Sequence, residues 1–381
     1  MIQIYNPDLN SIEIEYSKEI KKTFLHKIDN IHEVLSILRS RNIVNEKTVE
    51  NKVNYLTSAL IAATGIKNLL NSKSLKENRK TQDLIYSLNQ LKISSDKRSR
   101  CRKTIKYNNI ELQIKKIKKF INKKNLFGSE PQFLMELNNT LNRYLGTIDK
   151  NLYFFFFNYT KYYEIINNKI GKQLNLNCCP YCNRNYITYI PNGIKRHIGP
   201  TYDHFFSKEN YKYLTVSFYN LIPSCYTCNS NLKGRNNFKL NTNIHPFVEG
   251  FDNDCTFDFE LSTKDYLGRK EISYIPKLEI KDFVSSSKKI KIKGNLKVFK
   301  LNQIYESHED SIEEIYTRFD KGSPYYIGSI SEILNKLNVT EEEFYRFHFR
   351  NYFNEIEFNK RPLAKLDKNI YEKFKSISDI N

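Results

Sequence analysis

The sequence predicts an α+β protein in which a small cysteine-rich core lies between a mainly helical N-terminal region and a C-terminal region of strands followed by helices. Three observations predict this order. Hydrophobic residues follow helical spacing up to about residue 170, Gly, Pro, Cys and His concentrate between Gly171 and Gly250, and alternation followed by helical spacing resumes after residue 256. The expected regions are residues 1–170, 171–256 and 257–381.

The N-terminal region is predicted to be helical because its apolar residues recur at intervals of three and four. Examples are Ile31, Val34, Leu35 and Leu38, then Val53, Leu56, Leu60 and Ile61, and later Ile114, Ile117 and Ile121. The segment from Leu152 to Tyr163, with four consecutive phenylalanines, is expected to be core, and a partner-facing surface is the alternative.

The central and C-terminal elements are predicted from turn residues and alternation. Tyr186–Ile190 and Ile194–Ile198 flank an Asn-Gly pair, which is typical of a β-hairpin. Residues 257–300 alternate apolar and polar positions, for example at Ile290 and Ile292, and predict further strands. From Tyr305 onwards the spacing is again helical.

Composition excludes two classes of protein. The chain has 381 residues, with 40% hydrophobic and 27% charged, as expected of a folded chain rather than a disordered one. The longest apolar run, Leu152–Phe157, is too short to cross a bilayer, so no membrane contact is expected. Met1–Tyr5 lacks the basic start of a secretory signal, and a cytoplasmic location is therefore expected.

The charge distribution favours a polyanionic partner. The chain carries 61 Lys and Arg against 42 Asp and Glu, a net charge of +19. Residues 97–124 hold 12 basic side chains and one acidic one, and residues 172–236 hold 8 and 2. The alternative is a solvated lysine-rich face, which is common in basic chains.

The cysteines predict a metal centre. Their number is odd, seven, and two Cys-x-x-Cys pairs are present, which argues against a secreted disulfide framework. Cys179 with Cys182 and Cys225 with Cys228 can supply four thiolates to one tetrahedral Zn²⁺. A redox motif is the weaker alternative because no βαβ pattern surrounds it.

The remaining cysteines are assigned more simply. Cys178 adjoins a predicted ligand and is a possible substitute for it, whereas Cys101 and Cys255 are expected to be small hydrophobic residues.

Polar residues of catalytic type lie between and after the two pairs. Asp203 and His204 are adjacent, Asn220 precedes the second pair, Asn229 follows its last cysteine, and Lys233 lies one helical turn further on. Each alone is more often a local hydrogen bond or a helix cap. Their order, however, brings a carboxylate, an imidazole and an amide around one zinc-stapled segment.

This order resembles a known family. Cys-Pro-Tyr-Cys from Cys179, Asp-His-Phe-Phe-Ser-Lys from Asp203 and Asn-Leu-Ile-Pro-Ser-Cys-x-x-Cys-Asn from Asn220 are similar to the HNH nucleases, which have a ββα-metal fold. The resemblance covers about residues 175–235 and is strongest to HNH subunits of bacterial anti-phage defence systems, Septu-like or retron-associated. Those subunits act beside an ATPase.

The resemblance implies a metal-dependent DNA endonuclease. His204 would be the general base, and Asp203 and Asn229 would hold a catalytic Mg²⁺ or Mn²⁺, with Asn229 where the family often has His. Asn220 would brace the loop that carries His204, and Lys233 would place positive charge near the phosphate. The partners it implies are DNA and an ATPase of the same defence system.

Further residues are expected to support this role. His245, before Pro246, is expected to pack or cap, and a contact with the ligand shell or a phosphate is the alternative. DNA phosphates would be gripped without sequence readout. The residues expected to do so are Lys97, Arg98, Arg100, Arg102, Lys103, Lys115, Lys116, Lys118, Lys119 and Arg196.

A function of a different class is a non-catalytic zinc module that binds nucleic acid or a protein partner. Such a module needs the four cysteines but has no need of Asp203, His204 and Asn229 together.

Overall fold

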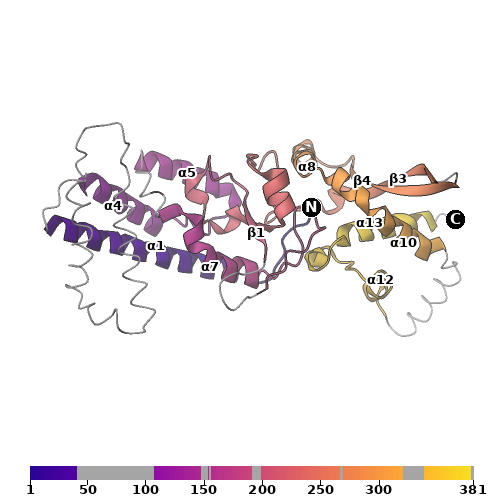
Figure 1. The fold of residues 1–381 in the computed structure, drawn as a ribbon, viewed down its shortest axis with the longest axis horizontal. Helices are drawn as coiled ribbons and strands as arrows, with labels where there is room; N and C mark the ends of the chain where they lie inside the picture. The colour runs from indigo at the N-terminus through magenta and orange to yellow at the C-terminus, as the bar shows by residue number, and fades with distance from the viewer. Residues whose placement is uncertain are drawn as a thin grey trace.

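The computed structural model describes residues 1–40, 107–146, 153, 156–190, 199–266, 269–320 and 339–378. Within these ranges the fold is elongated and mixes helices with two small antiparallel sheets, which confirms the α+β class (Figure 1). The principal elements are α1 (Leu9–Ser40), α4 (Tyr107–Lys123), α5 (Pro131–Leu145), α7 (Tyr163–Ile166), β1 (Thr201–His204), β2 (Leu221–Ser224), β3 (Cys255–Tyr266), β4 (Arg269–Ile280), α8 (Ser286–Phe299), α9 (Leu301–Tyr305), α10 (Glu309–Asp320), α12 (Glu341–Phe349) and α13 (Ala364–Ser378). No helix in the described ranges has both the length and the apolar character needed to cross a membrane.

The N-terminal helices pack around an aromatic centre at one end of the molecule. Helix α4 lies along α1 and buries Ile114, Ile117 and Ile121, as the spacing predicts. The ring of Phe24 on α1 stacks on Phe156, with ring centroids 4.9 Å apart. Phe156 and its neighbour Phe157 are buried, so these two residues are core rather than a docking surface. The residues at 154–155 lie outside the described residues.

The short strands β1 and β2 form the central sheet. They are antiparallel, with Asp203 opposite Ile222 and His204 opposite Leu221. All four residues of β2 are buried, because the strand runs through the middle of the molecule. In the expected hairpin before β1, Tyr186 bridges Cys178, while the Asn-Gly turn falls in residues 191–198, outside the described residues.

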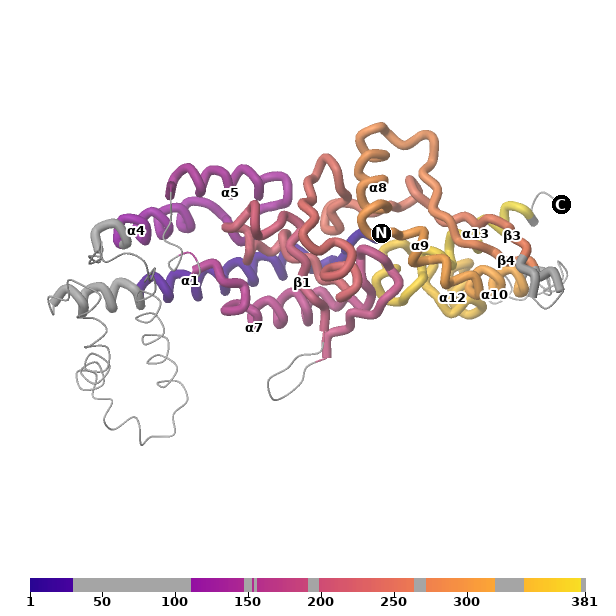
Figure 2. Tube along the Cα trace, turned by 45° about the horizontal axis from the view of Figure 1, so that its top comes forward, coloured from indigo at the N-terminus to yellow at the C-terminus, as the bar shows by residue number. Residues whose placement is uncertain are grey.

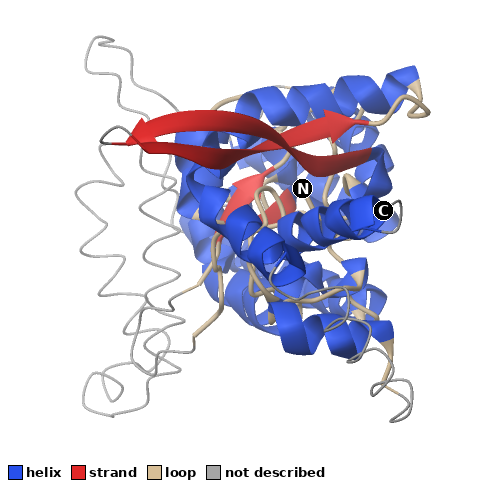
Figure 3. Ribbon diagram, turned by 90° about the vertical axis from the view of Figure 1, so that its right-hand side faces the viewer, coloured by secondary structure: helices blue, strands red, loops and turns tan. Residues whose placement is uncertain are grey.

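The second sheet, β3 and β4, is a ribbon at the opposite end. Its buried face packs on α10 and α13, and the ring of Phe259 stacks on Phe374 at 5.2 Å. Figure 3 shows the ribbon lying across the helices at this end of the molecule. Strands are thus found where the alternation begins, after Cys255.

The predicted strand at Ile290–Val298 is wrong, because this segment is helix α8. Ser285 caps the helix by accepting a hydrogen bond from the backbone N–H of Lys288. The buried residues Ile292, Asn295 and Phe299 recur at intervals of three and four, which only a helix can bring to one face. Alternation over a few Lys and Ile residues therefore resembled a strand by coincidence.

The N-terminal segment lies at the middle of the molecule (Figure 2). The backbone N–H of Ile2 donates to the carbonyl of Pro180 at 2.9 Å, and that of Ile4 to the carbonyl of Pro246 at 2.8 Å. Ile2 also packs with Phe358 and Ala364 near the C-terminus. One buried apolar cluster runs from this segment through the central residues to α13.

Candidate functional site

The four predicted zinc ligands form one buried cluster. The Sγ atoms of Cys179, Cys182, Cys225 and Cys228 all lie within 4.8 Å of one another. Four thiolates at the usual Zn–S distance of about 2.3 Å would be roughly 3.8 Å apart, so this cluster can hold a tetrahedral ion. The predicted clustering of these four cysteines is therefore confirmed.

Electrostatics around the cluster favour a thiolate at Cys225. Hydrogen bonds from the other three cysteines lower the pKa of the Cys225 thiol far below its usual range. The side-chain amide of Asn185 and the backbone N–H of Cys228 also donate to Cys225 Sγ, at 3.3 and 3.4 Å. Donors directed at one sulfur stabilise its anionic form, which is the form that binds metal.

Two further buried cysteines lie outside the cluster. Cys178 is fully buried beside Cys179, yet its sulfur is not among the four that converge. Burial raises the pKa of Cys178 to about 12 and that of Cys255 to about 11, so both are neutral thiols. They are small apolar residues, as was expected of Cys255.

Asp203 and Lys233 form a buried ion pair next to the four-cysteine cluster. Lys233 Nζ donates to Asp203 Oδ1 at 2.8 Å, and the two side chains are only 2% and 3% exposed. The hydroxyl of Tyr181, which lies between the first two cysteines, donates to Asp203 Oδ2 at 2.7 Å. Lys233 also donates to the backbone carbonyl of His204 at 2.8 Å. These hydrogen bonds connect strand β1 to the first cysteine pair, through Tyr181, and to the helical turn that contains Cys228, through Lys233.

Lys233 reaches this position from a wide helical turn, η6 (Thr227–Lys233), that begins just after Cys225. The turn ends at Gly234, whose φ of 47° lies in the left-handed region that favours glycine. Its backbone N–H donates to the carbonyl of Asn229, which closes the turn. The local order is thus strand, strand and helical turn, with a cysteine pair at the last junction.

His204 points away from the ion pair, as expected for adjacent residues of one strand. Its Nε2 lies 3.0 Å from the carbonyl oxygen of Thr215, and its ring packs edge-on against Tyr159 at 5.3 Å. A carbonyl only accepts, so Nε2 carries the proton and Nδ1 holds the free electron pair. Desolvation lowers the pKa of His204 to about 4, so the ring is neutral at pH 7.

The carbonyl that orients His204 belongs to a loop held by the N-terminal helical region. Thr215 Oγ1 donates to the carbonyl of Phe157 at 2.8 Å, and Ser217 Oγ donates to that of Leu126 at 2.8 Å. The hydroxyl of Tyr16 on α1 donates to the carbonyl of Val216 at 2.8 Å. The orientation of the imidazole therefore depends on residues far outside the resembling segment.

Asn220 spans the loop between β1 and β2. Its Oδ1 accepts from the backbone N–H of Phe206 at 2.7 Å, and its Nδ2 donates to the carbonyls of Phe206 and Leu214 at 3.2 and 2.9 Å. The side chain is fully buried. These bonds join the segment just after His204 to the segment just before Thr215.

Asn229 lies within η6, and its side chain is half-buried. Its described hydrogen bonds are made by the backbone: its N–H donates to the carbonyl of Cys225, and its carbonyl accepts from the N–H of Gly234. Among the described hydrogen bonds, none joins the side chains of Asp203, His204 and Asn229 to one another. The three residues belong to neighbouring elements, while their side chains have separate partners.

The surroundings of Asp203 bear on the oxygen ligands implied for a catalytic ion. Both oxygens of Asp203 already accept short hydrogen bonds, from Lys233 and Tyr181, and the carboxylate is almost wholly buried. An ammonium group 2.8 Å from the carboxylate repels a divalent cation. As described, the residues do not fit Mg²⁺ or Mn²⁺ at Asp203 while Lys233 is bound there.

His245 is a packing residue. Its Nε2 lies 3.0 Å from the carbonyl oxygen of Tyr219, and its Nδ1 accepts from the backbone N–H of Phe247 at 3.3 Å. The ring packs 4.2 Å from that of Phe205. Burial lowers the pKa of His245 to about 3, so it is neutral and both ring nitrogens are occupied.

The predicted phosphate contacts are only partly within the described residues. Lys97, Arg98, Arg100, Arg102, Lys103 and Arg196 lie outside them. On α4, Lys115 and Lys119 are exposed, and Lys118 pairs with Asp29 at 3.2 Å. Lys116 lies 5.6 Å from the centre of the Tyr144 ring. Of the predicted phosphate contacts on α4, Lys115 and Lys119 thus remain exposed without a described ion pair.

Sequence reasoning missed two residues of the site. Tyr181 donates to Asp203, and its ring stacks on Phe299 of α8 at 4.4 Å, which places α8 against the four-cysteine cluster. Its position between Cys179 and Cys182 indicates in the sequence that it lies at the site. Thr215 acts through its backbone carbonyl, for which side-chain identity gives no signal.

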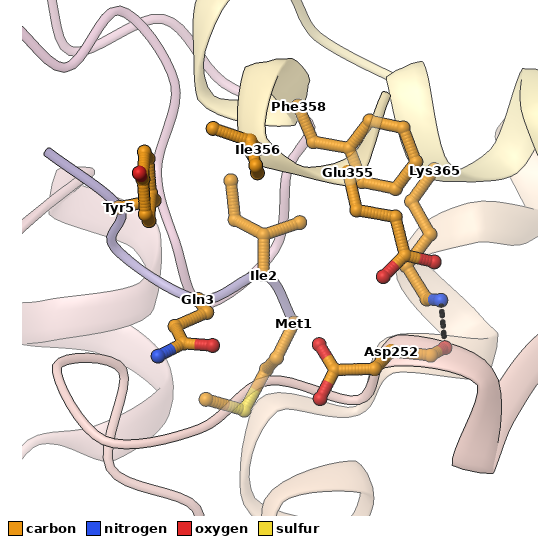
Figure 4. Close-up of a pocket in the computed structure, with 9 residues that line it drawn as sticks. All are labelled: Met1, Ile2, Gln3, Tyr5, Asp252, Glu355, Ile356, Phe358 and Lys365. Atoms are coloured by element: carbon orange, nitrogen blue, oxygen red, sulfur yellow. Dashed lines mark hydrogen bonds between the residues drawn. The ribbon is translucent and has the colours of Figure 1, made fainter. Parts of the chain in front are cut away.

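A separate cavity of about 190 Å³ lies between the N-terminal segment and the C-terminal helices (Figure 4). Its lining includes Ile2, Glu355 and Lys365, and the buried Lys365 ammonium donates to the backbone carbonyl of Asp252. None of the predicted site residues lines this cavity.

Comparison with known proteins gives no match to any protein-family model, to any curated protein or to any solved structure.

Proposed function

We propose that this chain is a zinc-stabilised endonuclease of the HNH type that hydrolyses DNA phosphodiester bonds. The observation that carries the proposal is the four-cysteine cluster around the strand–strand–turn unit that bears Asp203, His204 and Lys233. The net charge of +19 supports a polyanionic substrate.

The base in this proposal is His204. With the Nε2 proton directed at Thr215, Nδ1 is the nitrogen that accepts a proton from a water molecule. The activated water attacks phosphorus as the bond to the 3′ oxygen breaks, and that oxygen takes a proton from solvent, which leaves a 5′ phosphate and a 3′ hydroxyl. The pKa near 4 keeps the base unprotonated at neutral pH. We assign no step to a divalent ion, and the metal requirement rests on the resemblance alone.

The test is plasmid cleavage by the wild type and by His204→Ala, each with Mg²⁺, with Mn²⁺ and with chelated divalent ions. We expect nicking by the wild type and at least a hundredfold slower nicking by the variant, because general-base catalysis supplies about 10²–10⁴-fold. His348→Ala, on the remote helix α12, is the matched control and should cut normally. Equal nicking by wild type and His204→Ala would contradict the proposal.

A non-catalytic zinc module remains the second candidate function, and the buried ion pair favours it. Lys233 and Tyr181 saturate the carboxylate that a nuclease of this family would offer to its ion. A wild-type chain that binds DNA but cuts under none of the three metal conditions would support this candidate over the nuclease.

The association with an ATPase of a defence system is proposed from the resemblance. Co-purification of the chain with the product of an adjacent ATPase gene, followed by the plasmid assay with and without it, tests this association. Full cleavage by the chain alone, unchanged by the ATPase, would contradict the dependence.

A further inference from the structure

Helix α8 carries a concentration of positive charge outside the two segments noted above. Residues 283–305 contain six lysines and no Asp or Glu. As a helix, this segment divides its lysines between two faces.

The lysines nearest the body of the protein are neutralised. Lys288 pairs with Asp254, and Lys291 Nζ lies 2.7 Å from Glu249 Oε1. Lys293, Lys297 and Lys300 are exposed and have no ion pair among the described residues. Lys293 and Lys297 are one turn apart on the face opposite Phe299, and Lys300 follows at the end of the helix. These three residues are called the α8 lysine face.

The helix is held rigidly against the candidate site. Asn295 Oδ1 accepts from the backbone N–H of Ile244 at 2.9 Å, and Gly294 lies against the carbonyl of Thr242. Helix α8 packs on η6, and Phe299 stacks on Tyr181, which binds Asp203. Charges on a fixed helix lose less conformational freedom on binding than charges on a loop.

We propose that the α8 lysine face binds the phosphate backbone of duplex DNA beside the candidate site. The inference rests on the proposed function for its substrate class, and it names a contact surface that the sequence analysis did not include. Three cations without a described ion pair, spread over about 10 Å of one helix face, complement the row of negative charges along a DNA backbone. The contact would be independent of sequence.

The experiment measures binding of a 30-base-pair fluorescent duplex by the full chain at 50–200 mM salt. Every protein carries His204→Ala, so that cleavage does not interfere. The test variant is Lys293→Gln/Lys297→Gln/Lys300→Gln. The control is Lys360→Gln/Lys373→Gln/Lys375→Gln, which removes the same net charge from lysines that are already paired with Glu357, Asp258 and Glu341.

The logarithm of the DNA-binding constant falls linearly with the logarithm of the salt concentration, and each phosphate contact contributes about 0.9 to the slope. We expect this slope to be shallower by about 2.7 in the test variant, which lacks three contacts. Between 50 and 200 mM salt the parent should therefore lose about 40-fold more affinity than the test variant. The control should keep the parent's slope.

An unchanged slope in the test variant, or an equal change in the control, would overturn the inference. Loss of binding to phosphatidylserine vesicles with an unchanged DNA slope would also overturn it, in favour of a lipid surface. If His204-dependent cleavage is found but the slope is unchanged, the proposed function stands and this inference fails. Absence of DNA binding by the parent would overturn both.

Discussion

The buried ion pair between Lys233 and Asp203 is the residue-level feature with the largest consequence for the site. Removing one partner of a buried pair leaves an uncompensated charge, whereas removing both leaves none. If Lys233 alone is removed, Tyr181 is the remaining described side-chain donor to the Asp203 carboxylate. The cost of an unpaired buried charge can therefore be measured by comparing the stability of single and double variants.

We predict that Lys233→Met lowers the free energy of unfolding by about 3–5 kcal/mol. The double variant Asp203→Asn/Lys233→Met should lose clearly less, because an amide carries no charge to be left unpaired. Urea denaturation of both proteins measures the difference. A double variant as unstable as the single one would show that Lys233 contributes mainly through packing against Phe238, whose ring centre lies 4.9 Å from Nζ.

At the same scale, the sequence predicted residue types better than their partners. The four cysteines are recognisable because spacing of two residues has a direct meaning for a tetrahedral ion. The partners of Asp203 were not predictable, because Tyr181 and Lys233 reach it from opposite cysteine pairs. Motif spacing gives no information about which donor a buried carboxylate will accept.

At the scale of elements, helix α8 shows how packing decides secondary structure. Gly294 lies where the helix meets the loop before His245, and a methyl group there would be 2.1 Å from the carbonyl oxygen of Thr242. A glycine inside a helix usually costs about 1 kcal/mol relative to alanine. Here the close approach to another backbone accounts for it.

We predict that Gly294→Ala destabilises the protein by about 1–2 kcal/mol, because the steric cost of overpacking exceeds the gain in helix propensity. Urea denaturation provides the measurement. Lys293→Ala, at an exposed position of the same helix, is the control and should change stability by less than about 0.5 kcal/mol. A stabilised Gly294→Ala protein would mean that α8 does not lie against Thr242.

Helix α4 and the start of the β3 strand followed from periodicity, whereas α8 did not, and the helix predicted around residues 53–61 lies outside the described residues. In α4 the burial of Ile114, Ile117 and Ile121 repeats over two turns, which is enough to define a face. In α8 lysine and isoleucine alternate over only a few residues, so two periods fit equally well. The helix is favoured by tertiary contacts, because Asn295 and Phe299 contact residues of other segments from one helix face.

At the scale of the whole molecule, the first cysteine pair is a junction of three segments. The carbonyl of Pro180 accepts from Ile2, and Tyr305 donates to the carbonyl of Cys182. The side chain of Asn183 donates to the carbonyl of Phe358 at 2.7 Å and accepts from the backbone N–H of Lys365 at 3.1 Å. The proposed zinc therefore fixes the point where the N-terminal and C-terminal segments meet.

We predict that removal of zinc by a chelator lowers the midpoint of thermal unfolding by at least about 10 °C, since structural zinc contributes directly to folding energy. Unfolding followed by circular dichroism should coincide with zinc release, because one apolar cluster connects all regions. Cys225→Ser should lose the metal, and Cys178→Ala should retain it. Zinc release well before loss of helix would contradict this coupling.

The hydrogen bonds from Thr215, Ser217 and Tyr16 have a practical consequence for any attempt to isolate the proposed nuclease unit. An excised fragment of residues 175–235 would retain the four clustered thiols and the imidazole of His204. It would lack the helices that set the angle of the ring, since Leu126 and Phe157 lie upstream of that fragment. We therefore expect a fragment limited to the recognisable motif to lose the ring orientation that His204 has in the whole chain.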